Sequence, residues 1–187
     1  MKHIHEIMLV TSNKNKVKEF RHVLEPEVKV NHIEMSYPEL RHDSNEEIAK
    51  ESAERLAKEI KKAVVVEDSG LFIDALNGLP GVCSAYIHKR IGLPGTLKLL
   101  EGEKNRRAYY FSAVAYCKPG KKPVTFTGRE DGTIAISVRG NNGWGHDPVF
   151  IPDNDTRTYG EMSDVSEKKR FRAMAIKKLK EYLLHEH

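Results

Sequence analysis

Two adjacent carboxylates stand at a place where α/β enzymes often carry their chemistry. Glu67 and Asp68 directly follow the apolar run Ala63–Val66, which is the strongest strand signal in the chain. In open α/β sheets, ligands bind beyond the carboxyl ends of the strands. Carboxylates at such a position can hold Mg²⁺ and accept a proton from water. The alternative is structural, with Asp68 or Ser69 capping a following helix, and the residues alone leave both interpretations open.

A polar segment after the first expected strand, Ile7–Val10, is suited to binding phosphate. A helix N-terminus presents free backbone N–H groups and the positive end of the helix dipole. Lys16 stands one turn inside this helix and could reach a phosphate as a point charge. The segment lacks the glycines of a P-loop, and an ordinary capped helix with exposed lysines is the alternative. Its residues are Thr11, Ser12, Asn13, Lys14, Asn15 and Lys16.

A glycine-rich loop carries the single tryptophan of the chain. A flat ring held between glycines can stack on a nucleobase, a contact worth roughly 1–3 kcal/mol. A tight turn with the ring tucked into a local cluster is the structural alternative. No second His or Cys accompanies His146 at ligand spacing, so zinc is not expected. The residues concerned are Gly143, Trp144, Gly145, His146 and Asp147.

The densest basic cluster opens the last expected helix, Ser166–Leu184, and consists of Lys168, Lys169 and Arg170 together with Arg172. A solvated helix face is the usual explanation of such a run, and cations placed against a phosphate or a purine edge are the functional one. Lys and Arg number 31 against 27 Asp and Glu, which gives a net charge of +4. Because these charges are mixed along the chain, they differ from the concentrated stripe typical of a nucleic-acid binder.

Strands and helices must alternate at the start of the chain to position these residues. The apolar patterns predict strands at 7–10, 28–35 and 63–66, and helices over 17–24 and from Ser44 to about Lys62. Shorter helices are expected at 71–76 and 96–100. Residues 108–118, 124–128 and 133–138 indicate antiparallel strands. The predicted fold class is α/β, a long mixed central sheet flanked by helices.

Length and composition limit the class of protein further. The 187 residues suit one domain. No apolar run reaches the roughly 18 residues of a membrane span, and no secretory signal is expected. Cys83 and Cys117 are too few for a disulfide framework or a zinc cluster. We therefore expect a reducing, cytoplasmic location.

Five segments in order resemble the inosine triphosphate pyrophosphatase family, the HAM-like enzymes that hydrolyse non-standard purine nucleoside triphosphates. The resemblance extends from about Ile7 to Leu183. The segments are Ser12-Asn13-x-x-Lys16 with Glu19, Glu67-Asp68-Ser69-Gly70-Leu71, Leu79-Pro80-Gly81-Val82-x-Ser84, Gly143-x-Gly145-x-Asp147-Pro148-x-Phe150, and the basic C-terminal helix.

The resemblance implies Mg²⁺-dependent hydrolysis of ITP, dITP and XTP to the monophosphate and pyrophosphate. It also implies a homodimer and one domain over residues 1–187, with two lobes and a nucleotide cleft between them. Asp68 would be the general base and a metal ligand, with Glu67 and Asp43 as further metal ligands. Residues 11–16 would bind the phosphates, Ser69 would touch the substrate, and residues 144–147 would cover the base.

The last motif departs from the family pattern of lysine-asparagine followed by Ser-His-Arg. Arg170 takes the place of the family arginine, Lys169 that of the histidine and Lys168 that of the serine. Because the His-Arg pair helps to recognise the 6-keto edge of the purine, the base preference of this chain stays open.

Two other functions fit part of the sequence. A nucleotide- or RNA-binding module without turnover would suit the basic charge, Trp144 and the tyrosine-rich strands. It leaves Glu67 and Asp68 unexplained, because acids repel phosphate unless a metal intervenes. A related pyrophosphatase that prefers modified pyrimidines would share the same phosphate chemistry.

Overall fold

The computed structural model describes residues 5–185 and places their strands in one mixed seven-stranded sheet. The strand order is β2-β1-β3-β5-β6-β7, and β4 pairs with β3. The strands are β1 (His5–Val10), β2 (Val28–Ile33), β3 (Val64–Ile73), β4 (Pro80–Gly81), β5 (Arg107–Cys117), β6 (Val124–Ile134) and β7 (Phe150–Pro152). The helices are α1 (Lys14–Leu24), α2 (Asn45–Ile60), α3 (Ser84–Lys98), α4 (Val165–Lys168) and α5 (Arg170–His185).

The described chain divides into two compact units. Unit 1 contains residues 5–68, 112–128 and 170–185, and unit 2 contains residues 69–111 and 129–169. The dividing points lie within β3, β5 and β6 and between α4 and α5. The predicted α/β class with a mixed sheet and flanking helices is thereby confirmed.

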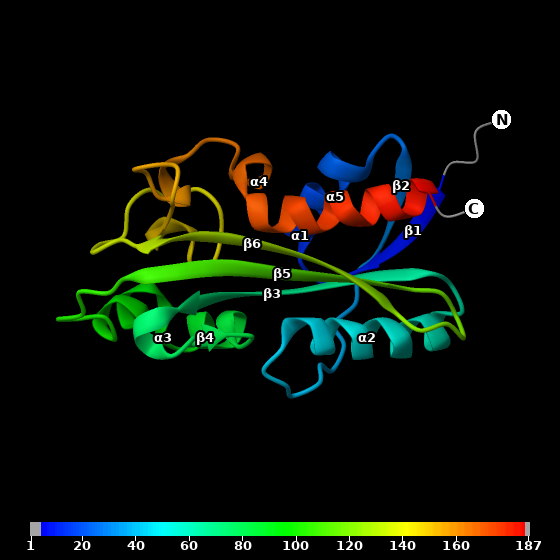
Figure 1. Cartoon of the computed structure of the whole chain (residues 1–187), viewed down its shortest axis with the longest axis horizontal. Helices are drawn as coiled ribbons and strands as arrows, with labels where there is room; N and C mark the ends of the chain where they lie inside the picture. Colours follow the sequence, from blue (N-terminus) through cyan, green and yellow to red (C-terminus); the bar gives the residue numbers. More distant parts are fainter. Residues whose placement is uncertain (1–4, 186–187) are drawn as a thin grey trace. The chain divides into compact units, whose positions relative to one another are not determined.

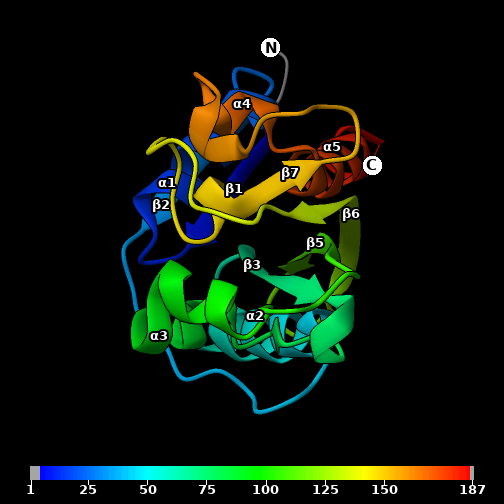
Figure 2. The same ribbon diagram turned by 90° about the vertical axis from the view of Figure 1, so that its left-hand side faces the viewer.

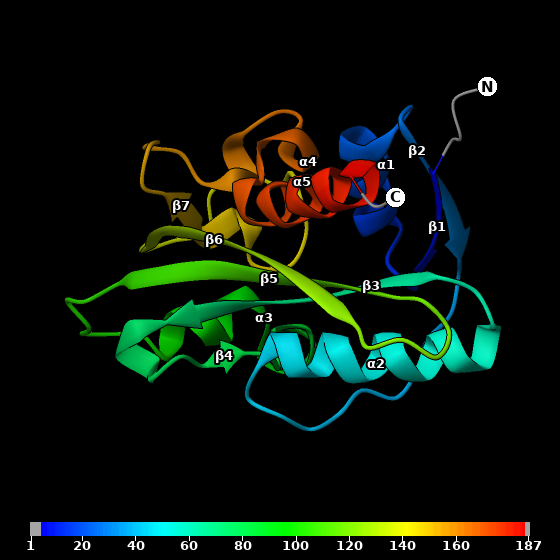
Figure 3. The same ribbon diagram turned by 45° about the vertical axis from the view of Figure 1, so that its right-hand side comes forward.

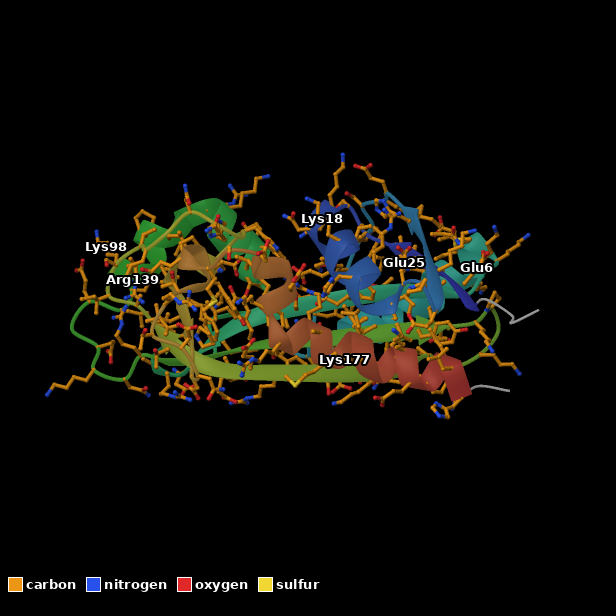
Figure 4. The ribbon with its side chains drawn as sticks, turned by 90° about the horizontal axis from the view of Figure 1, so that it is seen from above. Glu6, Lys18, Glu25, Lys98, Arg139 and Lys177 are labelled. Carbon is orange, nitrogen blue, oxygen red and sulfur yellow. The ribbon has the colours of Figure 1, made fainter. Side chains whose placement is uncertain are left out.

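In unit 1, helices cover both faces of the sheet. Strand β1 runs parallel to β2 and β3, with α1 and α5 packed together on one face and α2 on the other (Figure 1). Phe20 of α1, Leu9 of β1 and Leu179 of α5 belong to one buried apolar cluster, which fixes both helices against the strands. Lys18 of α1 and Lys177 of α5, labelled in Figure 4, are exposed.

In unit 2, the 3₁₀ turn Asp74–Leu76 and the residues after it bring β4 back along β3, and α3 lies beside β4 (Figure 3). The hydroxyl of Ser84 donates to the carbonyl of Gly81 over 2.6 Å and accepts the amide of Leu71 at 2.8 Å. Gly70 permits this pairing, because a Cβ there would lie 2.1 Å from the Gly81 oxygen. At the other edge, β7 pairs antiparallel with β6 (Figure 2).

The predicted helix at 71–76 is wrong. Leu71 and Ile73 continue β3 and are buried, and only Asp74–Leu76 form a single 3₁₀ turn. Pairing with β4 sustains the strand here, and that pairing cannot be found from local pattern alone. Glu67 and Asp68 therefore lie inside a strand and not beyond its end.

Three further boundaries differ from the predictions. Helix α3 begins at Ser84, not near residue 96, and turns sharply at Gly92, whose φ is 62°. Strand β6 passes without interruption through Asp131 and Gly132 and ends at Ile134. The predicted break at 131–132 is therefore wrong, and residues 135–138 of the second predicted strand lie outside any strand. The last helix is broken at Lys169, whose ψ of 100° is extended.

Within residues 5–185, no helix has both the length and the apolar character to cross a membrane.

Candidate active site

Asp68 lies on β3 next to the first residue of α2. The side-chain amide of Asn45 donates to Asp68 Oδ2 over 2.8 Å. The hydroxyl of Ser44 caps the same helix by accepting the Glu47 amide, so the helix start holds Asn45 in place. Burial raises the pKa of Asp68 to about 7, against the opposing effects of Lys16 and the Asn45 hydrogen bond. A carboxyl that titrates near neutral pH is suited to accept a proton from water.

Glu67 is buried among partners of opposite charge. Its Oε2 lies 2.7 Å from Lys16 Nζ, and its Oε1 accepts the Ser112 hydroxyl at 2.6 Å and Arg172 Nε at 2.9 Å. Arg172 also pairs with Glu19. Burial by itself would raise the pKa of Glu67, but Arg172 and Lys16 lower it to about 2. Together with Asp68, these residues form the unit-1 cluster, which is Lys16, Glu19, Glu67, Asp68 and Arg172.

The predicted phosphate-binding segment meets this cluster through Lys16. The side chain of Asn13 caps α1 by accepting the amides of Asn15 and Lys16 at 2.9 and 3.3 Å. These two amides are therefore already satisfied within the chain. Lys16 Nζ reaches across to β3 and donates to the Glu67 carbonyl over 2.9 Å. The hydroxyl of Thr11 accepts the Asn13 amide at 3.1 Å, and Ser12 and Lys14 are exposed.

The loop before α2 brings Glu39, a residue that the sequence analysis did not select, near Asp68. The charge of Glu39 adds to the rise in the pKa of Asp68. Arg55 holds this loop, because its guanidinium donates to the Pro38 carbonyl over 2.6 Å and lies 5.9 Å from the Tyr37 ring centre. Asp43 is exposed. Across residues 5–185, no three or more His, Cys, Asp or Glu are grouped to hold a metal ion by themselves.

The glycine-rich loop of unit 2 is built around Asp147. Its Oδ2 accepts the Trp144 amide at 2.6 Å and lies 2.8 Å from Lys169 Nζ. The same ammonium lies 4.3 Å from the Trp144 ring centre, a cation–π distance. Tyr110 donates its hydroxyl to Oδ1 at 3.4 Å. Gly143 is required beside this carboxylate, because a Cβ there would lie 2.2 Å from Oδ2.

His146, which lies in the same loop next to Asp147, is buried. Its ring lies 4.9 Å from the ring of His88 and its Nε2 lies 3.5 Å from the Thr96 hydroxyl. Burial, with a smaller contribution from His88, lowers the pKa of His146 to about 4. The imidazole is therefore neutral near pH 7. We call Trp144, His146, Asp147 and Lys169 the unit-2 cluster.

The three predicted basic residues of the last motif have different surroundings. Lys169 is 2% exposed at the break between α4 and α5, whereas Lys168 and Arg170 are exposed. Arg172, which the sequence analysis placed in the same basic cluster without a role of its own, is fully buried. Its spacing gave a signal, because Arg172 has the helical periodicity of Ile176, Leu179 and Leu183, all of which are buried. Ser69 follows Asp68 on β3 and is half-buried.

Comparisons with known proteins agree on one family. The model of the Ham1 family matches residues 7–182. A dITP/XTP pyrophosphatase of Methanopyrus kandleri is 48% identical over 84% of this chain and 84% of its own length. Another, from Thermococcus kodakarensis, is 46% identical over 95% and 96% of the two chains. The solved structure of a HAM1 protein from Coxiella burnetii superposes with a TM-score of 0.83 at 28% identity, covering 97% of this chain and 100% of that one.

Proposed function

The chain belongs to the Ham1 family, and we propose that it hydrolyses non-standard purine nucleoside triphosphates such as ITP, dITP and XTP. The products would be the nucleoside monophosphate and pyrophosphate, which removes these nucleotides from the pool. The observation that carries the proposal is the unit-1 cluster. There Asp68, held by Asn45, follows Glu67 on β3, and Glu67 contacts the ammonium of Lys16.

In the proposed reaction, water attacks the α-phosphorus and pyrophosphate is the leaving group. Asp68 would take the proton from that water, because it is held by Asn45 and titrates near neutral pH. Lys16 would offset charge on the phosphates from its position against Glu67. Residues 11–15 and Ser69 would line the phosphate-binding region around them.

A divalent metal fits the residues present. Mg²⁺ takes oxygen ligands and is commonly bound by one or two carboxylates together with substrate phosphates and water. The carboxylate of Asp68 would provide one such ligand on β3, and we propose the exposed Asp43 as a second. When bound, Mg²⁺ would neutralise charge on the phosphates.

The unit-2 cluster would recognise the base. The Trp144 indole would stack on the purine, and the carboxylate of Asp147 would accept the N1–H that hypoxanthine and xanthine carry. Lys169, with Lys168 and Arg170 nearby in sequence, would donate to the 6-keto oxygen. Adenine offers an acceptor at N1 and an amino donor at position 6, so both contacts would be mismatched.

The experiment that tests this function is pyrophosphate release from ITP, XTP, GTP, ATP and dUTP, each with Mg²⁺ and with EDTA. We expect Mg²⁺-dependent release that is fastest with ITP and XTP. Binding of ITP without turnover would instead indicate the nucleotide-binding module. Preference for dUTP would indicate a pyrimidine enzyme.

We also propose that the enzyme acts in the cytoplasm, where the nucleoside triphosphate pool lies. The single two-lobed domain and the homodimer implied by the family resemblance stay predictions. Light scattering coupled to gel filtration would measure the assembly directly, and a mass near 21.3 kDa would contradict the dimer.

A further inference from the structure

Arg172 connects three elements of unit 1 behind the proposed phosphate-binding lysine. It lies in the first turn of α5 and is 1% exposed. Its Nε donates to Glu67 Oε1 on β3 over 2.9 Å, and its Nη1 pairs with Glu19 on α1. Neither the proton transfer nor the phosphate contacts proposed above use this residue.

Glu67 divides its carboxylate between two cations. Oε2 contacts Lys16, whereas Oε1 contacts Arg172 and the Ser112 hydroxyl. A lysine ammonium has three donor hydrogens, and the carboxylate and carbonyl of Glu67 face this one at 2.7 and 2.9 Å. The side chain of Lys16 retains 16% exposure. The ammonium is thus held against Glu67, while part of the Lys16 side chain remains exposed to solvent.

In the ion pairs that link Lys16, Glu19, Glu67 and Arg172, Arg172 supplies one of the two positive charges. Lys16 and Arg172 carry two positive charges, and Glu19 and Glu67 carry two negative ones. Without Arg172, these four residues would lose one positive charge, and Glu67 would exchange its contact with two cations for a contact with Lys16. An anion approaching Lys16 would then meet a lysine whose charge is cancelled by its neighbour.

We propose that Arg172 is a positioning residue that acts through Glu67 to keep the Lys16 ammonium in place and attractive to phosphate. The proposal rests on the proposed function, in which Lys16 binds the triphosphate. It makes Glu67 the shared counter-ion of Lys16 and Arg172, in place of its predicted role as a metal ligand. Both oxygens of Glu67 already contact donors, and a metal ion would have to displace one of them.

A double-mutant cycle tests this coupling, with inorganic tripolyphosphate as the probe and calorimetry as the measurement. We expect Arg172→Met to weaken tripolyphosphate binding about tenfold, the size expected for one charge acting over several ångströms in a partly screened site. In a Lys16→Met background, the same change should cost less than about twofold, because the residue through which it acts is gone. Equal losses in the two backgrounds would overturn the proposal.

Removal of a buried cation can also prevent folding, so a charge-balanced variant is needed. Arg172→Met combined with Glu19→Gln restores neutrality, and we expect it to recover thermal stability. Its tripolyphosphate affinity should stay at least about threefold below wild type, because Glu67 still compensates Lys16 alone. Full recovery of both stability and affinity would show a merely structural role and would contradict the proposal.

Two further variants complete the design. Lys177→Met removes a charge from the exposed face of the same helix, and we expect it to leave the affinity unchanged. Arg172→Lys retains the charge but cannot bridge two carboxylates as a guanidinium does, and we expect an intermediate affinity.

If Lys16→Met alone leaves tripolyphosphate binding unchanged, the phosphate role in the proposed function fails together with this proposal. If Lys16→Met weakens binding but the cycle is additive, only the proposal for Arg172 fails.

Discussion

The unit-1 and unit-2 clusters are both buried groups of ion pairs, but different kinds of backbone hold them. Lys16, Glu67 and Arg172 come from α1, β3 and α5, so regular elements fix all three. Trp144 and Asp147 come from a loop and its 3₁₀ turn, and Lys169 comes from the break between two helices. In the proposed function, the unit-1 cluster binds the phosphates, which are the same in every substrate, and residues on helices and strands are suited to that constant task. The unit-2 cluster would recognise the base, which differs between substrates, and loops tolerate the sequence changes that alter specificity.

The largest effect that this comparison predicts is at Asp68. Asp68→Asn keeps the shape of the side chain but cannot accept a proton from water. We expect kcat to fall by at least about 10²-fold, the lower range for a positioned acid–base group. Circular dichroism and thermal melting should match wild type. A folded variant with nearly full activity would remove Asp68 from the mechanism.

Lys16→Ala should weaken the binding of the substrate more than the binding of the product. Because the ammonium would contact phosphates, we expect the loss to be greater for ITP than for IMP, which lacks the β- and γ-phosphates. A charge-assisted contact of about 1.5–3 kcal/mol corresponds to roughly 10- to 150-fold in affinity for ITP. Calorimetry with both nucleotides measures the ratio. Equal weakening of the two would leave Lys16 as an ordinary lysine.

Trp144→Ala should weaken the binding of the base and leave the binding of the phosphates unchanged. Loss of stacking of about 1–3 kcal/mol should raise the KM for ITP by roughly 5- to 150-fold. Tripolyphosphate has no base, so its affinity should not change. Weaker tripolyphosphate binding in this variant would mean that the two clusters do not divide the substrate as proposed.

We expect Lys169 to contribute more than Arg170 to discrimination between purine bases. Lys169 is buried against Trp144 and Asp147, whereas Arg170 is exposed. We therefore expect Lys169→Gln to lower the ITP/ATP ratio of kcat/KM by at least about tenfold, and Arg170→Ala to lower it less. Mg²⁺ dependence should persist in both. A greater effect of Arg170→Ala would restore the assignment made from the sequence.

The last prediction concerns stability at mildly acid pH and not catalysis at pH 7. His146 has a pKa of about 4 when folded, below its ordinary value of 6.5. Between these values the unfolded chain binds more protons, so stability is full above about pH 6.5 and is lost as pH falls toward 4. The loss attributable to this residue is at most about 3 kcal/mol. Urea unfolding of wild type and His146→Asn across this range should give a flatter profile for the variant.

The sequence predicted the position of a site residue correctly where that position depends on residues nearby in the chain. The Asn13 cap and the position of Lys16 one turn into α1 follow from a strand, a capping residue and a helical stripe. Glu39 was not selected, and the ion pairs of Arg172 were not predicted, because both depend on partners distant in sequence. Those partners are reached through the loop before α2 and through the packing of α5. The mistaken helix at Leu71 has the same cause, since β4 determines that the strand continues.

The central claim is that water attacks the α-phosphorus of a purine triphosphate, and hydrolysis of ITP in ¹⁸O-labelled water tests it most directly. Mass spectrometry of the products reports which phosphorus received the oxygen. We predict one ¹⁸O atom in IMP and none in pyrophosphate. Label in pyrophosphate, or release of IDP with labelled inorganic phosphate, would place the attack at another phosphorus and contradict the account.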